Sequence, residues 1–200
     1  MFHVTCFAAP LTQPVSVDAL RDFLRLNDKS EDAQLSEFLA AAVDLFESES
    51  GRAVLSARYR QDLSAWPGGP IVLGKGGVTA ITSVNVYQAD GSALPLAAVQ
   101  WSADLMTPPA RVFVASVPAP IAGPTGIPVS PVGNVEFTAG WDTPASVPNA
   151  VRVAIKQLAA HWYETREAFT ASASEMKTTP KGWARVVDRY RTGVSGPWGQ

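Results

Sequence analysis

The strongest helical pattern in the chain lies at residues 149–169. An α-helix would gather its apolar residues, spaced three or four apart, on one face. These residues are Val151, Ala154, Ile155, Leu158, Ala159, Trp162 and Phe169. Pro148 and Asn149 favour a helix start, since proline is tolerated in a first turn and an asparagine oxygen can accept from a free N–H. So wide an apolar face needs a partner, and the other good helical patterns precede residue 51.

Those earlier patterns predict two helices over residues 15–51. Ser16 is a good N-cap for a helix over 17–27, and Ser30 is a candidate cap for a second helix that ends at Gly51. Apolar residues recur at helical spacing in both: Val17, Leu20, Phe23 and Leu24, then Leu35, Phe38, Leu39, Ala42, Val43 and Phe46. The sequence therefore predicts a helical hairpin with an apolar inside and an acidic outside.

From residue 52 the pattern alternates instead. Short segments rich in Val, Ile, Thr and aromatic residues, separated by Gly and Pro, predict strands at 57–63, 70–74, 81–96, 99–103, 110–116 and 134–141. Asp90 and Gly91 predict a hairpin, and Pro95 favours an edge position for its return strand. The glycine-rich segment 73–78 lacks the spacing of a phosphate loop, so it predicts a turn between strands.

Three further segments lie outside these helical and alternating blocks. Residues 1–14 contain two prolines and predict an arm or extended segment. The proline-rich segment 117–133 either packs on the β unit or contacts a neighbouring subunit. Near the C-terminus, Trp183, Val186, Val187 and Tyr190 share one face of a short basic helix. That helix either folds back on its own core or docks in a partner's groove.

The predicted fold class is α+β. It combines a small helical bundle framework of three main helices, an inserted antiparallel β unit and an extended C-terminal arm. We expect five segments: an N-terminal arm at 1–14, the helical hairpin at 15–51, the inserted β unit at 52–147, the closing helix at 148–170, and the C-terminal arm with its short amphipathic helix at 171–200.

Composition adds a charge asymmetry. Hydrophobic residues make up 46% and charged residues 17% of the chain, which argues against disorder, while 16 prolines and 15 glycines imply many turns. The net charge of −2 combines a net of −6 over residues 1–50 with a net of +4 over residues 151–200. The charged residues at these two ends either form solvated helix faces or have a binding role. In the second case, the two ends attract one another between copies, or the basic end binds an acidic partner. No run of 18 apolar residues and no signal-peptide pattern is evident.

Chemistry-bearing residues are few. His3 and His161 are the two histidines, and Cys6 is the single cysteine and has no nearby base. His161, Glu164 and Glu167 lie within two turns of one predicted helix, yet no second cluster completes a metal shell. We therefore expect no enzyme, no catalytic residue, no metal and no cofactor. An enzyme built on these three residues stays as an alternative.

Nucleic-acid recognition motifs are also missing from the sequence. It has no zinc-finger spacing, and its isoelectric point is near 5.7. Arg185, Arg189 and Arg191 could contact either DNA or an acidic protein surface.

Several separate elements of the chain, in their order, resemble the head-to-tail connector (adaptor) proteins of tailed bacteriophages and gene transfer agents. The likeness spans residues 15–191. The elements are Ser50-Gly51-Arg52, Phe137 to Trp141, Pro148, His161-Trp162-Tyr163-Glu164 with Arg166-Glu167, and finally Pro180, Gly182, Tyr190 and Arg191.

The resemblance implies a structural protein of the virion at the head–tail junction, made in the host cytoplasm. Such proteins form a homo-oligomeric ring, commonly a dodecamer, below the portal protein. The ring joins the portal to a stopper or tail-terminator protein, and genome DNA passes through the channel without sequence readout. No membrane partner is implied. The alternative is a DNA-binding packaging or head-completion factor without a ring role.

The resemblance also implies residue roles. Family members grip the portal with their C-terminal segment, which here corresponds to Trp183, Arg185, Val186, Val187, Arg189, Tyr190 and Arg191. The predicted closing helix supplies core and intersubunit residues: Leu158, His161, Trp162, Tyr163, Glu164, Arg166 and Glu167. Within it, we interpret Leu158 and Trp162 as core against the 16–50 hairpin.

Overall fold

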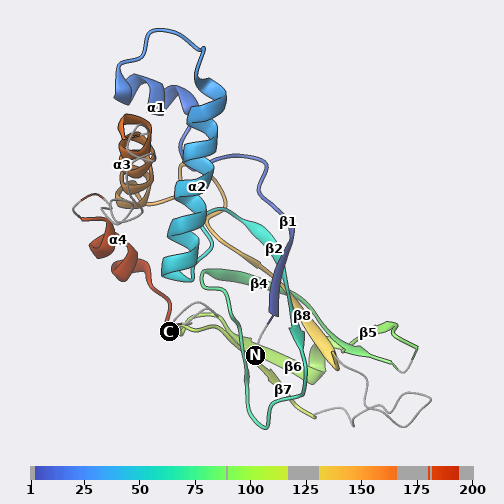
Figure 1. The fold of residues 1–200 in the computed structure, drawn as a ribbon. Helices are drawn as coiled ribbons and strands as arrows, with labels where there is room; N and C mark the ends of the chain where they lie inside the picture. Colours follow the sequence, from blue (N-terminus) through green and yellow to red (C-terminus); the bar gives the residue numbers. More distant parts are fainter. Residues whose placement is uncertain (1–2, 89, 117–130, 166–179, 181, 194–200) are drawn as a thin grey trace. The chain divides into compact units, whose positions relative to one another are not determined.

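The computed structural model describes residues 3–88, 90–116, 131–165, 180 and 182–193 (Figure 1). The chain forms two compact units. The helical unit comprises Pro10–Leu55 and Trp141–Arg191, and the β unit comprises Met1–Ala9, Ser56–Gly140 and Thr192–Gln200. The predicted mixture of helices and antiparallel sheets is confirmed, and the described residues form four α-helices.

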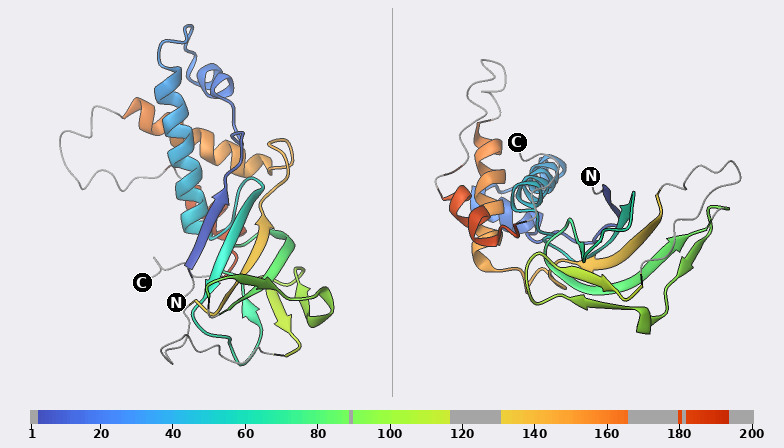
Figure 2. Two further views of the ribbon diagram at one scale, coloured as in Figure 1. Left: turned by 90° about the vertical axis from the view of Figure 1, so that its right-hand side faces the viewer. Right: turned by 90° about the horizontal axis from the view of Figure 1, so that it is seen from below.

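The helical unit contains α1 (Val17–Leu24), α2 (Asp32–Ser50), α3 (Asn149–Glu164) and α4 (Trp183–Tyr190). Figure 2 shows α3, in orange, crossing α2, in blue. The apolar faces predicted from the sequence meet here in one core, which includes Leu20, Leu35, Leu39, Phe46, Val151, Ile155, Leu158, Trp183 and Val187. None of the helices that the structure describes is long and apolar enough to cross a bilayer.

Two of the predicted helix ends are confirmed. The Ser16 hydroxyl oxygen accepts a hydrogen bond from the backbone N–H of Ala19 at 3.2 Å, so Ser16 caps α1. Gly51 ends α2 in the left-handed conformation with φ 70°, and its N–H bonds to the carbonyl of Glu47 at 3.0 Å.

Two other predicted ends are wrong. The first helix stops at Leu24 rather than residue 27, because Arg25 adopts φ 58° and the next N–H turns back to the carbonyl of Arg21. Ser30 does not cap α2: Glu31 holds the cap position, and its side chain makes no capping hydrogen bond. Ser30 instead donates its N–H and its hydroxyl to the Asp28 carboxylate, which fixes the turn before the helix.

The β unit contains two antiparallel sheets. One has the order β1-β2-β8-β4-β5, formed by His3–Ala8, Ala57–Leu63, Gly133–Ala139, Val78–Tyr87 and Ala93–Pro95. The other has the order β3-β7-β6, formed by Ile71–Val72, Arg111–Val114 and Trp101–Asp104, and a short 3-10 helix at Ala98–Gln100 precedes β6.

The sequence predicted all of these strands except β1. The extended N-terminal segment contains this strand, which lies at an edge of the larger sheet and pairs with β2. The Asp90–Gly91 hairpin is confirmed, with φ 83° at Gly91, and β5, which contains Pro95, is the opposite edge. The segment 73–78 connects β3 to β4, as predicted for a turn.

Polar side chains organise the interior of the β unit. Gln61 on β2 is fully buried; its amide donates to the carbonyl of Val72 at 2.9 Å and its oxygen accepts from the N–H of Gly74 at 2.7 Å. On β8, the buried Asn134 accepts from the Asn85 amide at 2.8 Å and donates to the Tyr87 hydroxyl at 2.6 Å. These bonds satisfy the buried amides and tie neighbouring strands together.

Candidate interaction surfaces

Helix α4 packs against the core of the helical unit. Trp183 is 3% exposed, lies edge-on to Phe46 with ring centroids 6.0 Å apart, and donates its indole N–H to the Glu49 carboxylate at 2.7 Å. Val187, one helical turn further, is also buried. Of the two alternatives for this segment, the structure therefore has the helix folded back on its own core.

An aromatic cluster continues from α4 to the return of the chain from the β excursion. Tyr190 lies 6.4 Å from Phe46 and 5.9 Å from Trp141, ring centre to ring centre. The Arg52 guanidinium carbon stands 4.5 Å above the Trp141 ring. Burial lowers the pKa of Arg52, while the nearby Tyr190 opposes this effect. The cation–π contact helps to hold this arginine in a half-buried position.

The opposite face of α4 is basic. Arg185, Arg189 and Arg191 are exposed, and Arg191 forms a surface ion pair with Asp188 at 3.1 Å. The seven residues predicted for portal docking thus divide into two groups. Trp183 and Val187 are buried and Val186 and Tyr190 are half-buried against the core, so of the seven only the three arginines are exposed.

The predicted core and intersubunit residues of α3 also divide. Leu158 is fully buried, and Trp162 and Tyr163 are partly buried against the same core. His161 is half-exposed, and its carbonyl accepts from the N–H and the hydroxyl of Thr165 at 3.0 and 2.6 Å. Glu164 is exposed. The remaining two candidates, Arg166 and Glu167, lie outside the described residues. Among the residues that the structure describes, no group of three or more His, Cys, Asp or Glu side chains could hold a metal ion.

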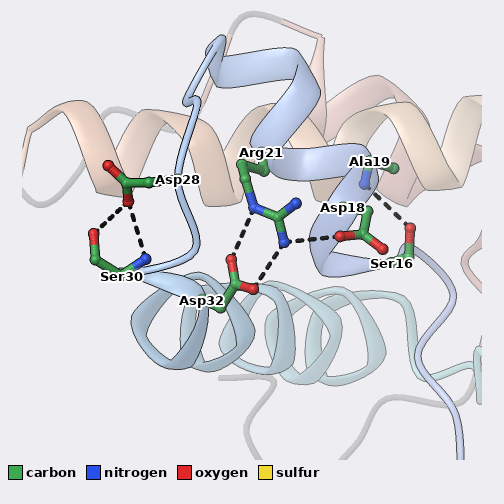
Figure 3. A network of polar contacts seen from close by, with 7 residues as sticks. All are labelled: Ser16, Asp18, Ala19, Arg21, Asp28, Ser30 and Asp32. Carbon is green, nitrogen blue, oxygen red and sulfur yellow. Dashed lines mark hydrogen bonds and ion pairs between the residues drawn. The ribbon is translucent and has the colours of Figure 1, made fainter.

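An ion-pair network joins α1 to α2 (Figure 3). The Arg21 guanidinium bonds to both carboxylate oxygens of Asp32 at 2.9 and 2.8 Å, and it also contacts Asp18 at 2.8 Å. The hydrogen bond with Asp32 is the main cause that raises the pKa of Arg21. This two-pronged geometry fixes the first helix on the second, because a planar guanidinium matches a carboxylate in one orientation.

The exposed face of α2 is narrow and acidic. It consists of Ala33, Glu37, Ala40, Ala41, Asp44 and Ser48, which recur at helical spacing. The carboxylates of Glu37 and Asp44 have no hydrogen bond or ion pair within the described part of the chain. We call this set the acidic face of α2. Its small residues would let another surface approach the helix backbone closely.

A groove of about 740 Å³ lies between residues 12–19 and the first half of α3. Its lining includes Pro14, Val17 and Val153, and it holds two cations, Arg152 and Lys156, one turn apart. A terminal guanidinium N–H of Arg152 donates to the side-chain oxygen of Asn149, but its buried Nε–H has no acceptor among the described residues. We call this feature the basic groove.

Sequence reasoning did not identify the basic groove. The i, i+4 spacing of Arg152 and Lys156 was visible on the predicted helix, but the proline-containing segment beside it showed no pattern that placed it there. The groove depends on the path of residues 12–16 across α3, which only the tertiary structure shows.

Comparison with known proteins found similarity among solved structures. No protein-family model and no curated protein matches the chain. A chain from "Neck of empty GTA particle computed with C6 symmetry" has 27% identity and a TM-score of 0.76, and the match covers 95% of each chain. A chain from "Virion of native gene transfer agent (GTA) particle" has 28% identity and a TM-score of 0.75, covering 94% of this chain and 95% of the other. A chain from "Neck of native GTA particle computed with C12 symmetry" has 26% identity and a TM-score of 0.73, covering 95% of each chain.

Proposed function

We propose that this protein is a structural adaptor of the head–tail neck in a gene transfer agent or tailed-phage particle. In this role it forms a ring below the portal and joins the portal to a stopper or tail-terminator protein, with DNA passing through the channel. The observation that carries the proposal is the similarity to neck components over 95% of the chain, with TM-scores of 0.76 and 0.73. The connector motifs at residues 50–52, 137–141 and 161–164 support the same family from the sequence.

Symmetry supports the ring. The two neck structures were computed with C6 and C12 symmetry, so a chain similar to their components fits a cyclic oligomer. A dodecamer is the subunit number that we propose. Cyclic assembly requires two different faces on each copy, and the helical unit carries faces of opposite charge.

We assign the portal contact to the exposed arginines in α4 and directly after it. Arg185, Arg189 and Arg191 form a basic surface for an acidic partner, while Trp183 and Val187 hold the helix in place. In this arrangement only part of the C-terminal segment contacts the portal, whereas a flexible arm would insert all of its residues. The arginines are proposed as the portal-binding part and the apolar residues as their support.

The experiment that tests the proposal uses particles from cells that produce them. Deletion of the gene should yield DNA-filled heads without tails, and a peptide tag on this chain should localise by electron microscopy to a ring at the head–tail junction. Normal tailed particles after deletion, or a label elsewhere, would overturn the proposal. An Arg185, Arg189 and Arg191 triple alanine variant should leave the fold intact and reduce recovery of the protein with portal-bearing heads.

A second function is favoured by one observation, the same three exposed arginines. A DNA-binding packaging factor without a ring role would use them to hold phosphate groups. In that case, the purified protein would bind duplex DNA with an affinity that falls steeply as salt rises, and no label would appear as a ring. Binding to heads emptied of DNA, at the level seen with filled heads, would exclude this alternative.

A further inference from the structure

The helical unit carries two surfaces that complement one another. The basic groove holds Arg152 and Lys156 beside apolar walls, and the acidic face of α2 holds Glu37 and Asp44 among small residues. From these surfaces we infer that the basic groove of one copy receives the acidic face of α2 from the next copy. This inference rests on the proposed function, because it supplies the contact between neighbouring subunits of the ring.

The positions of the two faces suit a head-to-tail contact. Helices α2 and α3 pack together through their buried sides, Leu35, Leu39 and Phe46 on one and Val151, Ile155 and Leu158 on the other. The acidic face of α2 and the exposed side of α3 therefore point away from each other. Two different faces on opposite sides of one unit generate a ring when each contact adds the same rotation. An isologous dimer would instead bring like charges together.

The groove has the chemistry to hold carboxylates. The buried Nε–H of Arg152 has no acceptor among the described residues, and an unsatisfied buried donor destabilises the free protein. A carboxylate from a neighbouring copy would satisfy it. Lys156 adds a second cation, although in the single copy its ammonium lies 5.2 Å from the centre of the Phe23 ring.

Apolar contact would add to the charge pairing. Val153 is 44% exposed between the two cations and lines the groove with Pro14 and Val17, so it offers apolar surface to a partner. On the acidic face, Ala40 and Ala41 lie between Glu37 and Asp44, so a flat apolar strip is flanked by two carboxylates. Glu37 and Asp44 are about 10 Å apart along the helix, and the long Arg152 and Lys156 side chains can spread to reach both.

Charge reversal tests this pairing in producing cells. One variant carries Glu37→Lys and Asp44→Lys, and the other carries Arg152→Glu and Lys156→Glu. Each alone should lower the titre of complete particles at least about tenfold, since like charges then meet at every contact. Expressed together, they can alternate around an even-numbered ring with every contact matched, so the titre should return to within a few-fold of the wild type.

A matched control separates this effect from net charge. Asp22→Lys with Asp142→Lys makes the same change in charge as Glu37→Lys with Asp44→Lys, at two exposed positions outside both faces, and it should leave the titre within a few-fold of wild type. Circular dichroism of each purified variant checks folding. Wild-type titre from either single reversal, or no recovery when the two folded variants are expressed together, would overturn the pairing.

Crosslinking distinguishes a failed pairing from a failed function. In a Cys6→Ser background, Val153→Cys with Ala41→Cys should give a ladder of oligomers in purified particles treated with a short bismaleimide, and Val153→Cys alone should give none. No ladder from particles that carry the protein in the neck overturns the pairing and leaves the neck role standing. If the protein is absent from particles, the neck role fails, and the same reaction on concentrated protein then decides the pairing by the presence or absence of a ladder.

Discussion

Replacement of Trp183 tests whether α4 belongs to the helical core. The side chain is 3% exposed and packs on Phe46, and its N–H bonds to Glu49 at 2.7 Å. A buried indole of roughly 200 Å² contributes about 4–5 kcal/mol at roughly 25 cal/mol per Å². A hydrogen bond to a carboxylate adds about 1.5–3 kcal/mol. The sum of these terms is an upper bound, because alanine keeps part of the apolar area and the exposed Glu49 carboxylate can bond to water instead. We expect Trp183→Ala to cost about 4 kcal/mol, in line with large-to-small core changes.

Trp183→Ala has a second possible outcome, in which α4 detaches while the rest of the helical unit stays folded. This happens if the docking free energy of α4 is smaller than about 4 kcal/mol, and the measured loss of stability is then limited to that docking free energy. Urea unfolding followed by far-ultraviolet circular dichroism measures the first outcome. Trypsin cleavage after Arg185 and Arg189 measures the second, because a detached helix is cut faster than a packed one.

Controls make this prediction specific. Ala184→Ser, at an exposed position beside Trp183, should change neither readout. A double-mutant cycle with Trp183→Phe and Glu49→Ala should show a coupling of about 1–2 kcal/mol from the indole–carboxylate bond. Wild-type stability together with wild-type trypsin resistance in Trp183→Ala would refute the packing of α4, and would restore the view of the C-terminal segment as a free arm.

Three further predictions concern the β unit. Gly133→Ala should destabilise the protein by about 2–3 kcal/mol, because a Cβ there would lie 2.4 Å from the carbonyl oxygen of Asn85, whereas Gly68→Ala, with no atom within 4 Å, should be neutral; the midpoint of urea unfolding compares them. Asn134→Ala removes the acceptor of one Asn85 amide N–H and the donor to the Tyr87 hydroxyl, so it should cost about 2–3 kcal/mol by the same measurement, and an unchanged midpoint would contradict this role. Hydrogen bonds from Ser92 lower the pKa of Asp90 below its ordinary 3.8. The ionised carboxylate therefore stabilises the fold fully above pH 3.8, and this stabilisation is lost as the pH falls through the folded-state pKa. Melting temperatures measured between about pH 5 and pH 2 should decline less in Asp90→Asn than in wild type.

Much of the fold follows from local patterns in the sequence. The helical spacing of Val151, Ile155 and Leu158 predicted both α3 and its buried side, because one period determines both. The Asp90–Gly91 turn and Pro95 predicted the hairpin and its edge position for similar local reasons. The similarity to components of gene transfer agent particles and their necks supports the broader part of the resemblance seen in the sequence, which is a protein of the head–tail neck.

The features that the sequence did not predict depend on contacts with other parts of the chain rather than on their own local pattern. Ser30 has the right chemistry for an N-cap, but the competing Asp28 carboxylate captures it in the preceding turn. Strand β1 has no alternation of apolar and polar residues because five of its six residues are exposed, so its extended form depends on pairing with β2. The position of α4 was open for a related reason: a short amphipathic helix carries the same pattern whether its apolar face meets its own core or a partner. Only the contacts of Trp183 and Val187 decide between them here.

The β excursion leaves and re-enters the helical unit at a single point. Leu55 and Trp141 form a β-bridge, and the Trp141 N–H bonds to the carbonyl of Val54 at 3.0 Å. The bridge between Leu55 and Trp141 holds the two ends of the 85-residue segment together within the helical unit. The intervening segment can therefore lengthen, shorten or be exchanged between relatives without disrupting the helical core. Proteins built this way could diversify the inserted part rapidly while the helical unit stays constrained. A chain in which a short linker replaces residues 56–140 offers a route to study the helical unit alone.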